Sequence, residues 1–65
     1  MPIIRIDIGK HSINSTQKKE LIETFTKTAA EITSIPANAF SIIINEYEDE
    51  NYGVGGLTLD KIRTH

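Results

Sequence analysis

Cysteine is absent from the 65 residues of this chain, and histidine occurs only twice, as His11 and His65. Without cysteine the chain forms no disulfide and no thiolate zinc site, and it gives no sign of an oxidising compartment. A domain of about 60 residues buries only about 60% of the surface that its unfolded chain exposes. Small domains compensate with disulfides, a structural metal or oligomerisation. Oligomerisation is the remedy that this composition leaves, and we expect an oligomer.

Long apolar runs and clusters of basic residues are also lacking. The net charge is −2 and the Lys and Arg residues are scattered, which does not indicate a nucleic-acid surface. The apolar stretch at residues 3–8 contains Arg5 and Asp7 and falls short of both a signal peptide and the roughly 20 residues that span a bilayer. We expect one cytoplasmic, soluble domain covering residues 1–65, with neither a nucleic-acid nor a membrane partner.

Two strands are indicated by β-branched apolar runs. Residues 3–8 alternate between apolar and polar side chains, which predicts a half-buried strand. Its isoleucines share one face: Ile4, Ile6 and Ile8. Residues 40–45 are apolar almost throughout, which is typical of an interior strand covered on both faces. An acidic loop at 46–51, a glycine-rich hairpin turn at 53–56 and a short tail follow.

A long helix is predicted between the strands, at residues 16–33. Asn14 or Ser15 can cap it, and Asn14 with Gln17 has the spacing of a capping box. Apolar residues at three- and four-residue steps form its buried stripe: Leu21, Ile22, Phe25, Ala29 and Ile32. Strand, helix and strand make a β-α-β unit with two parallel strands, and with the hairpin an α+β fold. One helix leaves one sheet face bare, so we expect sheets of two copies to join edge to edge and such dimers to pack face to face.

Pro2, directly after Met1, is the first candidate for chemistry. Aminopeptidases remove Met1 before a small residue, and Pro2 would then carry a secondary amine. An α-amino group titrates near 8, and burial in an apolar pocket lowers its pKa by disfavouring the cation. Such an amine can take a proton from a carbon beside a carbonyl and return it elsewhere. Taken alone, Pro2 fits an ordinary residue before a strand better, and it is the rest of the chain that favours the catalytic interpretation.

The segment Asn51-Tyr52-Gly53-Val54-Gly55-Gly56 is the second notable feature. It is neither a P-loop, since no Lys-Ser/Thr follows, nor a dinucleotide fingerprint, since no strand-to-helix unit surrounds it. Tyr52 can be a pocket wall or simple turn packing. The acidic residues before it lack the ordered pattern of a calcium loop, so we interpret them as a solvated loop.

These features together resemble the 4-oxalocrotonate tautomerase family. The resemblance lies in Met1-Pro2 before an Ile-rich strand, the Gln17-Lys18 and Leu21-Ile22 helix opening, Pro36 after the helix, the second strand, and the glycine turn. It covers nearly the whole chain, with one small insertion in the first loop. The Asn-Tyr-Gly-Val-Gly-Gly turn is most similar to the subgroup labelled DmpI.

The resemblance implies a hexamer, a trimer of dimers, with active sites shared between subunits and with no metal and no cofactor. Pro2 would be the general base, and Tyr52 matches the pocket aromatic of the family. Two arginines that bind substrate carboxylates in well-studied members are missing, because their positions fall near Ile13 and at Ser41.

Three other residues could supply the missing positive charge: Lys10 or His11 in the first loop, and Arg63 in the tail, reaching a neighbouring subunit. The predicted function is a tautomerase that moves a proton in a small enol or unsaturated keto acid. Losing an oxyanion partner costs on the order of 10²–10³ in rate, so we expect weak activity on dicarboxylates or a less charged substrate. The alternative is a non-catalytic oligomeric binding protein on the same fold.

Overall fold

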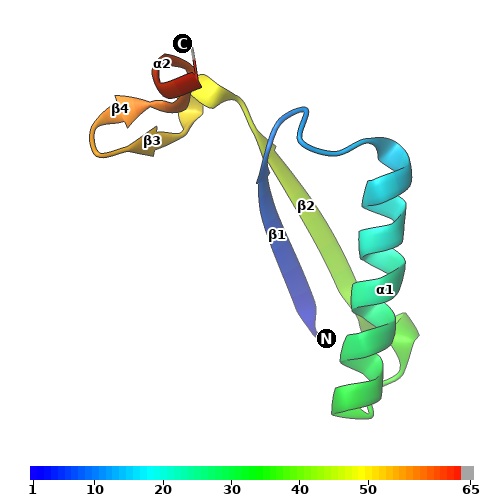
Figure 1. The fold of residues 1–65 in the computed structure, drawn as a ribbon. Helices are drawn as coiled ribbons and strands as arrows, with labels where there is room; N and C mark the ends of the chain where they lie inside the picture. Colours follow the sequence, from blue (N-terminus) through cyan, green and yellow to red (C-terminus); the bar gives the residue numbers. More distant parts are fainter. Residues whose placement is uncertain (64–65) are drawn as a thin grey trace.

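A computed structural model describes residues 1–63, except for the side chain of Arg63 (Figure 1). Strands β1 (Ile3–Gly9) and β2 (Ser41–Tyr47) pair in parallel as a two-stranded sheet. Helix α1 (Ser15–Thr33) connects them and runs along the sheet (Figure 1). The predicted β-α-β unit is therefore confirmed. No helix in the described part of the chain is long and apolar enough to cross a membrane.

Both ends of α1 are fixed by local hydrogen bonds. The backbone N–H of Gln17 donates to Oδ1 of Asn14 (2.8 Å), and the N–H of Asn14 donates to Oε1 of Gln17 (2.9 Å). This confirms the predicted capping box. At the other end Ser34 adopts a left-handed conformation (φ 61°) and its N–H donates to the carbonyl of Ala30 (2.9 Å). The helix thus ends before Pro36, whose ring could not continue it.

The two faces of the sheet differ as the alternation predicts. Ile4, Ile6 and Ile8 are half-buried, whereas Ile3, Arg5 and Asp7 on the opposite face are exposed. In the parallel register Ile4 lies beside Ile42, and Ile6 beside Ile44, so β2 continues the same apolar face. The second strand starts one residue later than predicted and ends two residues later, because a 3₁₀ turn (Ala37–Ala39) holds Phe40 as its cap.

The C-terminal part of the chain is more ordered than the sequence indicated. Residues 46 and 47, expected in an acidic loop, extend β2, and the remainder of that loop contains a 3₁₀ turn (Asp49–Asn51). The predicted hairpin is confirmed, with β3 (Gly53–Val54) antiparallel to β4 (Leu57–Thr58). Gly55 and Gly56 have φ of 61° and 86°, as a type I′ turn requires. The expected tail forms the short helix α2 (Leu59–Arg63).

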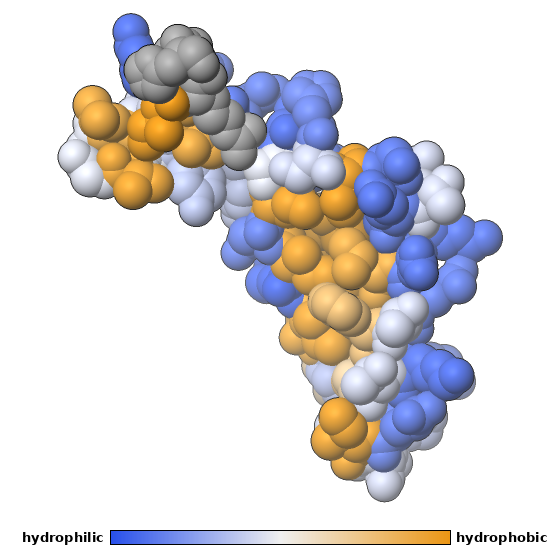
Figure 2. Space-filling model, in the orientation of Figure 1, coloured by the Kyte–Doolittle hydropathy of each residue, from blue (hydrophilic) through white to orange (hydrophobic). Residues whose placement is uncertain are grey.

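The described part of the chain has no buried core of its own. No described residue is fully buried, and the radius of gyration is 15.2 Å, against about 11 Å for a compact chain of this length. The hairpin and α2 project from the end of the sheet (Figure 1). Apolar surface is open between β1 and α1 and over the hairpin (Figure 2). Two predictions are therefore wrong for the single chain: β2 is an edge strand with one bare face, and the α1 stripe is not buried, since Ile32 is 79% exposed.

Candidate functional site

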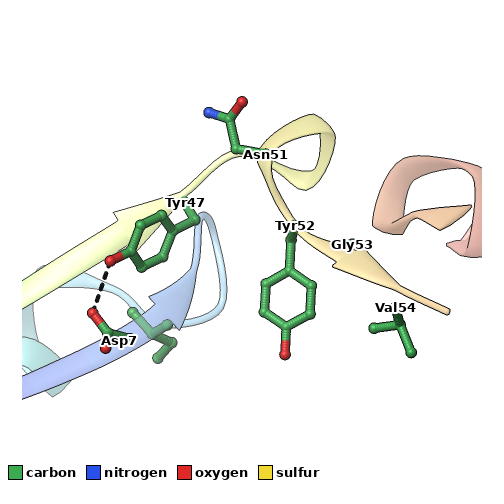
Figure 3. A pocket seen from close by; sticks show the side chains of 7 residues that line it. Asp7, Tyr47, Asn51, Tyr52, Gly53 and Val54 are labelled. Carbon is green, nitrogen blue, oxygen red and sulfur yellow. Dashed lines mark hydrogen bonds between the residues drawn. The ribbon is translucent and has the colours of Figure 1, made fainter. Parts of the chain in front are cut away.

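An open cavity of about 500 Å³ lies where the end of β1 meets the loop before the hairpin. Its lining comes from β1, the end of β2 and the hairpin: Asp7, Ile8, Tyr47, Asn51, Tyr52, Gly53 and Val54. The rings of Tyr47 and Tyr52 stand on either side of the space between the sheet and the hairpin, and Asn51 points away from it (Figure 3). Tyr52, predicted as either a pocket wall or turn packing, is thus a wall of this cavity.

Asp7 and Tyr47 form the polar contact of the cavity. The hydroxyl of Tyr47 donates to Oδ1 of Asp7 (2.9 Å), across the bare face of the sheet (Figure 3). This hydrogen bond, with the negative charge of Asp7, raises the pKa of Tyr47 above its usual value, because ionising the phenol would break the bond and place two anions side by side. Tyr47 therefore stays neutral over the working range of most enzymes.

Lys10 is held away from this cavity by an ion pair. Its Nζ donates to Oε1 of Glu48 (2.6 Å), which ties the first loop to the segment after β2. The hydrogen bond and the opposite charge raise the pKa of Lys10 and lower the pKa of Glu48. His11, the neighbouring candidate, is exposed and adopts a left-handed conformation (φ 68°). Neither Lys10 nor His11 lines the cavity.

Pro2 and Ser41 lie at the other end of the sheet. The backbone N–H of Ser41 donates to the carbonyl of Pro2 (3.0 Å), so these two predicted site residues are neighbours. Five residue steps along β1 separate Pro2 from Asp7, the first β1 residue that lines the cavity. At about 3.3 Å per residue, Pro2 lies roughly 17 Å from the cavity of its own chain. Within one chain the structure therefore divides the predicted site into two groups.

Ile13, near the position of a missing family arginine, belongs to neither group. Ile13 lines a separate apolar groove of about 330 Å³ beside the first half of α1, with Leu21 and Phe25. The side chain of Arg63 lies outside the described part of the structure. No group of three or more metal-ligating side chains occurs among the described residues.

Asp7 and Tyr47 are the pocket residues that sequence analysis did not identify. The sequence pattern predicts Asp7 on the strand face opposite Ile4, Ile6 and Ile8, and Tyr47 in a loop, so it does not predict a contact between them. The signal was available in the strand period: a second strand extended to Tyr47 puts that side chain on the same face as Asp7.

Comparison with known proteins identifies the family of the chain. The family model described as "Tautomerase enzyme" matches residues 2–62. A protein of Dickeya dadantii (strain 3937) described as "Probable tautomerase K2" is 32% identical over 63 residues, covering 97% of this chain and 94% of its own length.

Solved structures agree with this assignment. The heterohexamer 4-oxalocrotonate tautomerase of Chloroflexus aurantiacus is 27% identical over 97% of this chain and 100% of its own, with a TM-score of 0.84. DmpI of Helicobacter pylori is 26% identical over 92% of this chain and 98% of its own, with a TM-score of 0.79. These findings confirm the resemblance to 4-oxalocrotonate tautomerases, and the chain belongs to the tautomerase family.

Proposed function

We propose that this protein is a keto–enol tautomerase in which Pro2, freed by removal of Met1, is the general base. Membership of the tautomerase family supports an isomerase-type activity. The role of a base is supported by the chemistry of the Pro2 nitrogen. While Met1 is attached, this nitrogen belongs to an amide and is not basic. Removal of Met1 turns it into a secondary amine. Met1 is 95% exposed, so nothing in the fold protects it.

The proposed assembly is inferred from one observation: within a single chain, Pro2 lies far from the Tyr52 cavity. We infer that the active site joins Pro2 of one subunit to the cavity of another. The carbonyl of Pro2 and the N–H of Lys10 form hydrogen bonds with β2. The backbone N–H and C=O groups of successive strand residues point alternately to the two sides, so those of the odd-numbered residues of β1 point to the free edge of the sheet.

A two-fold axis at this free edge pairs β1 with β1 of a second copy in antiparallel orientation. The Pro2 end of each strand then lies beside the Gly9 end of its partner, next to the cavity that Asp7 and Ile8 line. The same contact covers the apolar surface that is open between β1 and α1 (Figure 2). The family resemblance implies that three such dimers then assemble into a trimer of dimers.

The chemistry needs one nitrogen with two protonation states. The neutral amine of Pro2 removes the proton of the enol hydroxyl, and the ammonium so formed delivers a proton to the carbon at the other end of the enolate. Burial in the subunit contact lowers the pKa of the amine towards neutrality, so that both forms are accessible. In the competing covalent route the same nitrogen attacks a carbonyl and forms an iminium.

The test compares three forms of the protein on phenylenolpyruvate and its methyl ester: the Met1-free protein, a form shown by intact mass to retain Met1, and Pro2→Ala. We expect the Met1-retaining form to lose activity on both substrates, and Pro2→Ala to lose most of it, since its primary amine remains a weaker catalyst. Borohydride trapping of a Pro2 adduct would assign the covalent route. Equal rates for all three forms would contradict the proposal and favour a non-catalytic binding protein.

A further inference from the structure

We propose that the cavity selects carbonyl compounds without a carboxylate, and that Asp7 is the residue that determines this preference. The inference rests on the proposed function, because it names the substrate class of the same site. It concerns a feature that the family resemblance does not supply: a carboxylate within the pocket, in a chain that lacks the two family arginines.

The first step is the charge of the cavity lining. Asp7 is the only ionised side chain among the seven lining residues. Only Oδ1 of Asp7 accepts the Tyr47 hydroxyl, and this hydrogen bond leaves the negative charge in place. The structure gives Asp7 no ion pair within 4 Å among the side chains that it describes. A substrate carboxylate entering this cavity would therefore meet a like charge.

The second step is the state of the cations nearby. Lys10 is paired with Glu48 (2.6 Å) and Lys18 with Glu46 (2.7 Å), so both lysines at this end of the sheet already have a carboxylate partner. Arg5 shares the bare face with Asp7, and its charge acts on Tyr47, where it lowers the pKa against the larger opposite effect of Asp7. Arg5 lies two residues nearer the Pro2 end and does not line the cavity. The described side chains thus offer an incoming anion no uncommitted cation at the cavity wall.

The third step is the shape of the space. The rings of Tyr47 and Tyr52 flank it, with Val54 beyond and the Asp7 carboxylate at one side (Figure 3). Two aromatic walls favour a flat, unsaturated molecule. The hydroxyl of Tyr47 donates to Asp7 and keeps its proton, because that hydrogen bond raises its pKa, so it does not add a second negative charge. An uncharged aryl or alkenyl ketone, aldehyde or ester matches both shape and charge.

The experiment measures binding with a matched pair of ligands, phenylglyoxylate and its methyl ester, which differ in charge and cannot enolise. Dissociation constants come from titrations of ¹⁵N-labelled, Met1-free protein followed by NMR at Tyr52 and Gly53. We expect the ester to bind more tightly by roughly tenfold, the size of a like-charge repulsion in a partly solvated site. Asp7→Asn keeps an oxygen that can accept the Tyr47 hydroxyl, and it should bring the ratio close to one.

Two further variants complete the design. Glu48→Gln releases Lys10 and should shift the preference towards the acid, whereas Glu23→Gln removes an equal charge on the outer side of α1 and should leave the ratio unchanged. The inference is overturned if the wild type binds the acid as tightly as the ester, if Asp7→Asn leaves the ratio unchanged, or if neither ligand shifts the cavity resonances. A preference for the ester without Pro2-dependent turnover would uphold this inference and overturn the proposed function.

Discussion

At the scale of single residues, the proposed chemistry rests on the nitrogen of Pro2 and on the hydrogen-bonded pair of Tyr47 and Asp7. The nitrogen changes from an amide to an amine when one peptide bond is cut, with no change elsewhere in the fold. The Tyr47–Asp7 pair fixes where a negative charge sits in the cavity, and its geometry is a 2.9 Å hydrogen bond across two strands. Both depend on protonation, so they can be examined by titration.

We predict that Asp7→Ala, which removes both the hydrogen-bond acceptor and the negative charge, lowers the pKa of Tyr47 towards the ordinary value of about 10. The chain has two tyrosines, so Tyr47 can be followed alone by absorbance at 295 nm in a Tyr52→Phe background. A pKa that is raised on folding contributes stability below the unfolded pKa, and this contribution is lost as pH rises through the folded pKa. The free energy of unfolding of the wild-type protein should therefore fall as the pH rises above about 10. An identical Tyr47 titration with and without Asp7→Ala would contradict the assigned hydrogen bond.

The elements are fixed mainly by local signals, and α1 shows this most clearly. Its first residue follows from the reciprocal bonds of Asn14 and Gln17 rather than from contacts with the sheet. Because the single chain buries so little, these local bonds form a larger share of its stability than in a larger domain.

We predict that Asn14→Ala lowers the free energy of unfolding by about 1 kcal/mol, the usual cost of removing a capping side chain. Ser15→Ala is the matched control, because Ser15 is the first helical residue and makes no capping bond in the structure; it should change stability by a few tenths of a kcal/mol at most. Urea unfolding at one fixed protein concentration measures both. An Asn14→Ala variant as stable as the control would show that packing, not the cap, fixes the start of α1.

The sequence predicts each element whose signal is local and misses what depends on other parts of the chain. The alternation of Ile4, Ile6 and Ile8, the capping box and the Gly55-Gly56 turn are all properties of short segments. The end of β2 was placed two residues early because acidic residues resemble a loop, whereas pairing with β1 keeps them extended. Pro2 and Tyr52 could be identified as candidates, but their separation in one chain needed the structure.

At the scale of the whole molecule, the described part of the chain lacks a core of its own. The described part of a single chain holds no fully buried residue, and the hairpin, with Val54 and Leu57 more than half exposed, extends from the sheet end. An isolated two-stranded hairpin is marginal at best in water. In the proposed dimer, a second subunit at the free edge of β1 both covers exposed apolar surface and brings the two parts of the site together.

A subunit-mixing assay tests most directly whether Pro2 of one subunit acts in the Tyr52 cavity of another. Pro2→Ala and Tyr52→Asp proteins, each poorly active, are unfolded together and refolded as a mixture. Half of randomly paired dimers then contain one chain of each kind, and each of these has one intact site, so about a quarter of wild-type activity should return. Activity no greater than the average of the two separate variants would place Pro2 and the cavity in one chain and contradict the account.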